Sequence, residues 1–377
     1  MIIKNGNIHD AVNRDAYVAD IALRSGKIAA IGKDLTPLAG EEIYDATGLQ
    51  VYPGLVEAHC HTGLNNDGTG DKDINDTSEY TGAQFRAIDA INPFNGNIKT
   101  TREAGVTTVC SGPGSASVFN GSFVAYKTWG TCIDDMILKY PAAMKCALGQ
   151  NVRSPKKQSS TRMGAAATFR KVMYEAQEYL AKKEAANGDP MKMPKTDLKM
   201  EALIPVLKKE IPIKMHAHRA DDICTAIRLA KEFDVNMVLD HVTGGRDCVA
   251  ELVRAGYPVA LGPALSGTSK LELRGKSFET CKVLDEAGLQ VAIITDAAVV
   301  PGEYLPLSAG LAVKAGMDPF KALQAITINA AKHVGVADRV GSLEVGKDAD
   351  VVIANGDIML SITKVVAVFI DGEKRVG

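Results

Sequence analysis

Two histidines one residue apart, His59 and His61, end an apolar run that begins at Val51. In a β-strand the side chains of residues i and i+2 point the same way, so both imidazoles would face one side at the end of a strand. Two nitrogens fixed on one face can begin a metal site, which then needs further ligands from other strands. The spacing therefore favours metal-dependent chemistry.

Further candidate ligands follow other apolar runs in the same way: His216 and His218, His241, and Asp296. Five of the seven histidines lie at such ends, which is hard to reconcile with ordinary core or surface histidines. Imidazole nitrogens and carboxylate oxygens suit zinc, and manganese, iron or cobalt could bind the same groups. A set without thiolates that leaves one position to water is typical of a catalytic site.

The bulk composition limits the class of partner. At 377 residues the chain can form one large α/β domain with an appendage, and its net charge of −2 gives no reason to expect nucleic acid or a membrane. We find no apolar stretch of membrane-spanning length and no signal-peptide layout at the start. Seven scattered cysteines favour reduced thiols. We therefore expect a cytoplasmic homo-oligomer that acts on a small-molecule substrate.

The middle of the chain alternates short apolar runs with helical signatures. Asp318-Pro319 has the chemistry of a helix start, and another helix is expected to open near Ser160. Eight strands joined by crossover helices are the count of a (β/α)8 barrel, whose chemistry sits at the C-terminal strand ends. A doubly wound sheet is the alternative, but no glycine-rich phosphate fingerprint follows the first strand. The expected strands lie near residues 51–58, 105–110, 122–126, 141–148, 211–216, 235–240, 257–262 and 290–295.

Both ends of the chain show short alternating runs typical of β-strands. Asn5-Gly6 and Ser25-Gly26 have the chemistry of tight turns between such strands. Two strand-rich ends that flank a long α/β middle predict one small β-domain assembled from both termini. We place this domain at residues 1–50 and 345–377, and the barrel at 51–344.

The run Pro53-Gly-Leu-Val-Glu-Ala-His-Cys-His61, with the later His216, His241 and Asp296, resembles the metal signature of the amidohydrolase superfamily. The opening Ile-Lys-Asn-Gly and the tail Gly341-Ser-Leu-Glu-Val-Gly-Lys-Asp-Ala-Asp350 are also similar, so the resemblance spans nearly the whole chain. Within the superfamily, the chain most resembles the imidazolonepropionase-like branch, which also holds Xaa-Pro and arginine dipeptidase-type enzymes. The resemblance implies a TIM-type (β/α)8 barrel with a small β-sandwich built from both termini.

The resemblance also implies a ligand set for one or two ions. Its members would be His59, His61, His216 and Asp296, with His241 either as a further ligand or as a donor to the substrate carbonyl oxygen. His218 is then a substrate contact or a residue that supports a ligand.

Lys145, at the end of the expected fourth strand, stands where some relatives carry a lysine carboxylated by carbon dioxide. An unmodified lysine is cationic and would repel a metal, so ligation requires the carbamate. The alternative is an ordinary lysine in a salt bridge.

The chemistry that follows is hydrolysis of a C–N bond by metal-activated hydroxide, with Asp296 taking a proton and passing it to the leaving nitrogen. The substrate would be a small polar amide, cyclic amide or dipeptide. A deaminase with the same metal site, or a catalytically silent barrel that binds a small molecule, are the alternatives. Candidates to grip a substrate carboxylate are Arg153, Arg162 and Arg219, because a guanidinium fork matches that group.

Overall fold

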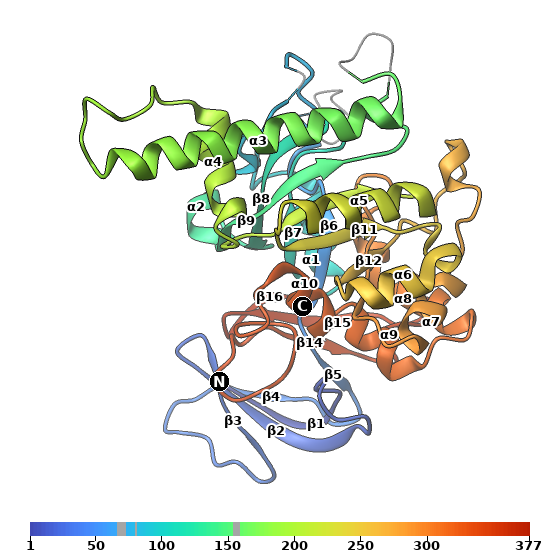
Figure 1. The fold of residues 1–377 in the computed structure, drawn as a ribbon. Coiled ribbons are helices and arrows are strands. Elements are labelled where there is room, and N and C mark those ends of the chain that lie inside the picture. The colour runs from blue at the N-terminus through green and yellow to red at the C-terminus, as the bar shows by residue number, and fades with distance from the viewer. Residues whose placement is uncertain (66–72, 80, 154–158) are drawn as a thin grey trace.

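The computed structural model describes residues 1–65, 73–79, 81–153 and 159–377. One eight-stranded sheet in the middle of the chain forms a nearly closed barrel, and a second sheet combines strands from both ends. In Figure 1 the terminal sheet lies below the barrel, while α3 (Arg162–Ala186) and α4 (Leu198–Leu207) lie above it. The fold is therefore a mixed α/β barrel with a smaller β-unit, and the barrel carries the candidate ligands.

The barrel strands overlap the eight apolar runs identified in the sequence, although residues 51–53 of the first run pair in the terminal sheet instead. The expected strict alternation of strand and crossover helix is wrong for one strand, because β8 runs antiparallel to both neighbours. The loop 112–118 is too short for a parallel crossover and makes a hairpin instead. The strands are β6 (Leu55–Cys60), β7 (Val106–Ser111), β8 (Phe119–Lys127), β9 (Ile137–Ala147), β10 (Ile213–Ala217), β11 (Met237–His241), β12 (Val259–Leu261) and β13 (Val291–Ile293).

The terminal sheet draws on both ends of the chain, as expected, and its description as a sandwich stays a prediction. Ser25 and Gly26 form the predicted turn, with φ of 50° and 73°. Asn5-Gly6 is not a turn: Asn5 adopts φ 60° at an irregularity inside β1. A Cβ on Gly6 would lie 2.5 Å from Val51, so only glycine fits this approach. The strands are β1 (Ile2–Ile8), β2 (Tyr17–Arg24), β3 (Lys27–Gly32), β4 (Ile43–Asp45), β5 (Gln50–Pro53), β14 (Val351–Ala354), β15 (Val365–Ile370) and β16 (Glu373–Val376).

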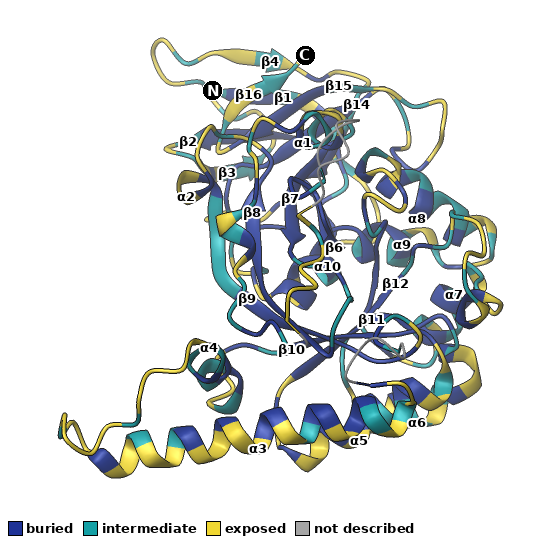
Figure 2. Ribbon diagram, turned by 90° about the horizontal axis from the view of Figure 1, so that it is seen from above, coloured by how far each residue is buried: buried dark blue, intermediate teal, exposed yellow. Residues whose placement is uncertain are grey.

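Helices surround the barrel, whose strands are buried while α3 exposes its outer face (Figure 2). The predicted helix starts are confirmed: the side chain of Asp318 accepts from the backbone N–H of Lys321, and Thr161 caps α3 through Gly164. The other helices are α1 (Gly96–Glu103), α2 (Ile133–Met136), α5 (Ala220–Glu232), α6 (Val249–Ala255), α7 (Glu279–Glu286), α8 (Leu305–Lys314), α9 (Pro319–Ala325) and α10 (Ile328–Val334).

Helix α10 closes the barrel at the N-terminal ends of its strands. The backbone N–H of Val56, at the start of β6, donates to the carbonyl oxygen of Ile326, just before this helix. Ala330, Ala331 and Val334 join the apolar core inside the barrel. The C-terminal strand ends are therefore left for a site.

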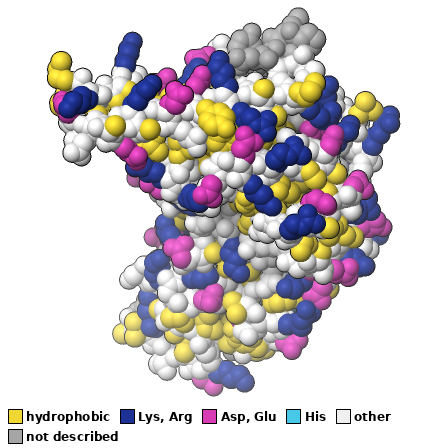
Figure 3. Space-filling view, in the orientation of Figure 1, with side chains coloured by type: hydrophobic (Ala, Val, Ile, Leu, Met, Phe, Trp, Pro, Cys, Tyr) yellow, Lys and Arg dark blue, Asp and Glu magenta, His cyan; other side chains and the backbone are white. Residues whose placement is uncertain are grey.

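Over the face seen in Figure 3, basic and acidic side chains are interspersed, in agreement with the net charge of −2. Within the described part of the chain, no helix has the length and apolar character needed to span a bilayer.

Candidate metal centre

Three ligand atoms converge where β6 and β13 end. The Nε2 atoms of His59 and His61 lie 3.3 Å and 3.2 Å from Oδ1 of Asp296. His59 lies in β6 and His61 follows it, so strand alternation turns both imidazoles toward Asp296, as the spacing predicted. Both histidines are buried, and the Asp296 side chain is only 14% exposed.

The far side of the His61 imidazole fixes which of its nitrogens carries the proton, and the far side of His59 approaches a carboxylate. Nδ1 of His61 lies 2.6 Å from the carbonyl oxygen of Gly112, which can only accept, so this nitrogen is the donor. Nδ1 of His59 lies 3.0 Å from Oδ2 of Asp240, and burial lowers the pKa of His59, which keeps its ring neutral. In a neutral ring with its proton on Nδ1, each Nε2 atom presents a lone pair to a carboxylate oxygen. Electron-rich atoms this close to one another call for a cation between them.

A second group of imidazoles lies beside the first and shares His241 with it. The ligand atoms of His216, His218 and His241 lie within 4.8 Å of one another, and so do those of His59, His241 and Asp296. The structure thus places His218, expected as a substrate contact, among the candidate ligands. The donor chemistry of both groups fits a divalent ion of the zinc type. Oδ1 of Asp296 is buried and has no hydrogen-bond donor among the described residues. A metal ion at this position would satisfy that oxygen.

The surroundings of His241 favour a ligand over a hydrogen-bond donor. Its Nδ1 lies 2.8 Å from the carbonyl oxygen of Gly262 and so carries the proton. Burial lowers the pKa of His241 to about 3, so the ring is neutral and Nε2 is an acceptor. His241 and Asp296 also adopt left-handed backbone conformations, with φ of 75° and 54°. Such strain costs roughly 1–3 kcal/mol per residue and tends to concentrate at functional sites.

The carboxylate of Asp240 supports the imidazoles through its contact with His59. Its Oδ1 lies 3.0 Å from Nζ of Lys214 and 3.3 Å from Nε2 of His333. Burial works to raise the pKa of Asp240, but Lys214 and His59 hold it well below its usual range. Sequence reasoning missed this residue, although a charged side chain inside an apolar strand, one position before His241, is a visible signal.

Lys145 lies on β9, in the predicted fourth strand, and is entirely buried. Its Nζ lies 3.4 Å from Nε2 of His59 and 3.7 Å from Oδ2 of Asp240. Burial lowers the pKa of Lys145 to about 8. The amine therefore lies next to the His59 nitrogen that faces the candidate metal position and near the carboxylate behind that ring.

Glu57 joins the first and last strands of the barrel. Its Oε2 accepts from the backbone N–H and the hydroxyl of Thr295, at 2.9 Å and 2.6 Å, and its Oε1 accepts from the N–H of His59. Burial raises the pKa of Glu57 to about 7. Glu57 thereby holds the segment that carries Asp296 against the strand that carries His59.

A cavity of about 490 Å³ opens on the imidazoles. This volume suits a small-molecule ligand. Four of the candidate ligand histidines and Asp296 thus share one space with mostly uncharged polar side chains. The cavity is lined by His61, His216, His218, His241, Asp296, Asn65, Asn75, Asn151, Ser115, Ser266, Ser269, Lys270 and smaller or apolar residues.

The structure does not bring the three predicted arginines, Arg153, Arg162 and Arg219, into this cavity. Each guanidinium donates to another group of this protein. Binding of a substrate carboxylate by these arginines therefore stays a prediction, which the cavity lining does not support. The partners are Asp222 for Arg162 at 2.9 Å, Asp221 for Arg219 at 2.9 Å, and the carbonyl oxygen of Ser160 for Arg153 at 3.4 Å.

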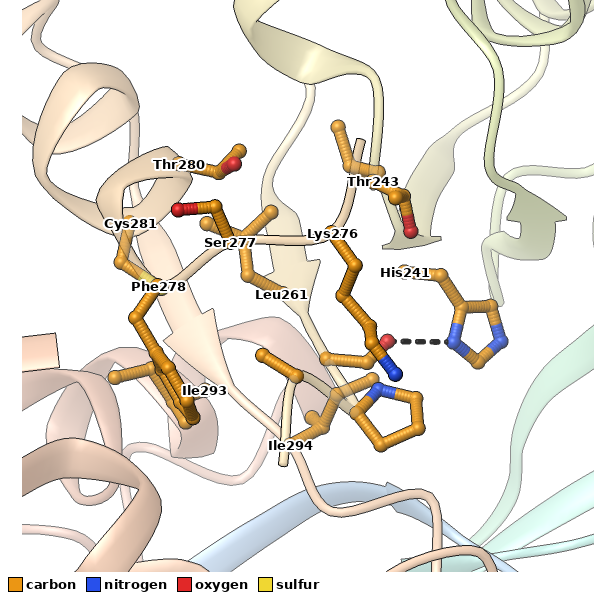
Figure 4. A pocket seen from close by; sticks show the side chains of 14 residues that line it. His241, Thr243, Leu261, Lys276, Ser277, Phe278, Thr280, Cys281, Ile293 and Ile294 are labelled. Atoms are coloured by element: carbon orange, nitrogen blue, oxygen red, sulfur yellow. Dashed lines mark hydrogen bonds between the residues drawn. The ribbon is translucent and has the colours of Figure 1, made fainter. Parts of the chain in front are cut away.

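A second pocket lies behind His241, between β12, β13 and α7 (Figure 4). The dashed line in Figure 4 is the bond from the His241 imidazole to the carbonyl oxygen of Gly262. At about 20 Å³ the pocket has room for little more than one water molecule. The residues that line this pocket hold the His241 imidazole from behind, and the pocket itself is too small to bind a substrate.

Comparisons with known proteins by sequence and by structure point to the same family. Residues 50–375 match the sequence model described as the Amidohydrolase family. Amidohydrolase tasK of Hapsidospora irregularis is 25% identical over 391 residues, which cover 94% of this chain and 40% of that protein. This chain thus spans less than half the length of that curated relative.

Solved structures agree in fold. The crystal structure of an amidohydrolase from Thermotoga maritima MSB8 superimposes with a TM-score of 0.96 at 36% identity, over 99% of this chain and 98% of that one. A Xaa-Pro dipeptidase with bound methionine gives a TM-score of 0.63 at 17% identity, over 100% and 99% of the two chains. The second likeness concerns the fold alone.

Proposed function

This chain belongs to the amidohydrolase family, and we propose that it hydrolyses a carbon–nitrogen bond of a small polar substrate with the help of a divalent metal. The observation that carries the proposal is the approach of the His59 and His61 Nε2 lone pairs to Oδ1 of Asp296 beside a cavity of about 490 Å³. Imidazole nitrogens and a carboxylate oxygen arranged in this way can together bind a divalent cation.

The residues that would hold the metal fall into the two groups that share His241. His59, His61, His241 and Asp296 make one set, and His216 with His218 extend it toward a second ion. The chemistry that a divalent metal supplies in such a set is Lewis acidity, which polarises a carbonyl oxygen and acidifies water. Zinc suits these donors, with manganese, iron and cobalt as alternatives.

Asp296 is the residue that we propose moves the proton. Beside a divalent metal the carboxylate of Asp296 would be ionised, because the charge of the ion favours the anionic form. An ionised carboxylate can accept a proton from the attacking water and return it to the leaving nitrogen. The strained backbone at Asp296 and the Glu57–Thr295 bonds beside it fix where this exchange takes place.

We also propose that Lys145 is carboxylated in the active protein. As an ammonium, its Nζ would compete with a metal for the lone pair of His59, which lies 3.4 Å away. Attack of the neutral amine on the carbon of CO2, with loss of one proton, forms a carbamate, whose single negative charge is shared by two oxygens. That change would turn a repulsive neighbour of His59 into a residue that could help to hold a metal.

The test combines metal analysis with a substrate panel. We expect the purified protein to contain a divalent metal, to lose activity on chelation, and to hydrolyse at least one N-acyl amino acid, dipeptide or lactam. Release of ammonia from an amidine substrate would identify a deaminase instead. A protein that keeps its metal yet turns over no substrate in the panel would be a silent binding barrel, and the proposal would be wrong.

A further inference from the structure

Lys270 is the cationic side chain that lines the wall of the cavity, among the described residues. Its Nζ donates to Oδ1 of Asn151 at 2.6 Å and to Oε1 of Glu272 at 3.3 Å. An ammonium has three N–H donors, and these two contacts use two of them. Among the described residues Lys270 therefore keeps one N–H donor for a molecule in the cavity.

Glu272 holds Lys270 from behind instead of competing for the cavity. Its side chain is 1% exposed and does not line the cavity, whereas the side chain of Lys270 is 25% exposed. The other carboxylate oxygen, Oε2, accepts from the backbone N–H of Gln150 at 2.8 Å. The carboxylate is thus anchored on both oxygens, and it fixes the ammonium at the cavity wall.

Asn151 sets the distance between this ammonium and the imidazoles. Its Oδ1 accepts from Lys270, and its Nδ2 lies 3.4 Å from Nε2 of His216. One side-chain amide therefore spans the gap between the cation and the candidate metal centre. A ligand that contacts both must carry its anionic group only a few bonds from the group that reaches the imidazoles.

We infer that Lys270 binds a carboxylate of the substrate, so that the substrates are amides with a carboxylate close to the bond that is cut, as in an N-acyl amino acid. This inference rests on the proposed function. A phosphate dianion would call for more than one cation, and the described lining offers Lys270 alone. Apart from Asp296 and the histidines of the candidate metal centre, the other polar groups of the described wall are uncharged, among them the amides of Asn65 and Asn75 and the hydroxyls of Ser115, Ser266 and Ser269.

The test compares N-benzoylglycine with N-benzoylglycinamide, which differ in the carboxylate. Binding to chelator-treated full-length protein is measured by calorimetry, so that no hydrolysis interferes. We expect the wild type to bind the carboxylate about tenfold more tightly than the amide, as for a charge-assisted hydrogen bond. Lys270→Met should abolish that preference. Lys282→Met, which removes the same charge from the exposed face of α7, should keep it.

Equal binding of the two compounds by the wild type, or an unchanged preference in Lys270→Met, would overturn the inference. Because Lys270→Met leaves Glu272 buried without its cation, the double variant Lys270→Met/Glu272→Gln is measured beside it and should lose the preference too. Turnover by the metal-loaded protein separates the two proposals. A carboxylate preference in binding with no turnover of any amide would support the Lys270 subsite and contradict the proposed hydrolysis.

Discussion

Nδ1 of His59 lies 3.0 Å from Oδ2 of Asp240, and the opposite nitrogen of the same ring lies 3.3 Å from Oδ1 of Asp296. One imidazole thus connects a buried carboxylate to the candidate metal position. A carboxylate behind a ligating histidine fixes its tautomer and ring orientation and raises its basicity. Lys214 and His333 keep Asp240 in place. These two residues therefore help to orient His59 through Asp240.

Asp240→Asn is expected to weaken metal binding while leaving the fold intact. The amide keeps the size of the side chain but loses the charge that orients His59, and loss of such a partner typically lowers metal affinity by about 10–100-fold. Competition with a chromophoric chelator measures the affinity. Asp222→Asn, which neutralises another buried carboxylate outside the cavity, is the matched control and should bind metal as the wild type does. Equal affinities for the wild type and Asp240→Asn would contradict the role assigned to Asp240.

Asp296→Asn should lower kcat more than it lowers metal content. The amide oxygen can still face His59 and His61, but it cannot take up a proton at neutral pH. Loss of a positioned acid–base group typically costs about 10²–10⁴-fold in rate. Metal analysis of the same sample separates the two effects. A variant that keeps full activity would show that another group moves the proton.

Bicarbonate should raise both bound metal and activity when the chelated protein is reloaded, because Lys145 can then form its carbamate. Lys145→Met cannot react with CO2 and should show no response to bicarbonate. Metal per chain and activity are measured with and without bicarbonate, at the same total metal. One metal per chain that is independent of bicarbonate in the wild type would count against the carbamate.

Positions of strands could be predicted from the sequence, but their directions and the supporting contacts could not. Apolar runs marked all eight barrel strands, and the ligands at their ends converge because C-terminal ends of parallel strands meet at one edge of the barrel. An apolar run carries no sign of direction, so the reversal of β8 was missed. Asp240 was missed because its role depends on Lys214 and His333, which reach it from another strand and from α10.

The arginines show a second limit of sequence reasoning. A guanidinium is a suitable partner for a substrate carboxylate, but nothing in the sequence tells whether another carboxylate already occupies it. Arg162 and Arg219 pair with Asp222 and Asp221, whereas Lys270 faces the cavity. Which cation meets the substrate is therefore a matter of tertiary contacts, and local sequence does not encode it.

His333 should make the folded protein less stable as the pH falls below neutrality. Burial lowers the pKa of His333 to about 4, well below the value of about 6.5 for an exposed imidazole. Between these values the unfolded chain binds a proton that the folded chain does not. The free energy of unfolding therefore decreases as the pH falls from about 6.5 to about 4, by on the order of 3 kcal/mol for this one group.

His333→Gln isolates that contribution. Glutamine can still donate toward Oδ1 of Asp240, which lies 3.3 Å from Nε2 of His333, but it does not titrate in this range. Urea unfolding of the chelated wild type and variant, near pH 7 and about pH 4.5, gives the two changes in free energy. The loss of stability between these conditions should be smaller in the variant by about 2–3 kcal/mol. Equal losses would mean that the imidazole of His333 takes up its proton in the folded protein as readily as in the unfolded chain.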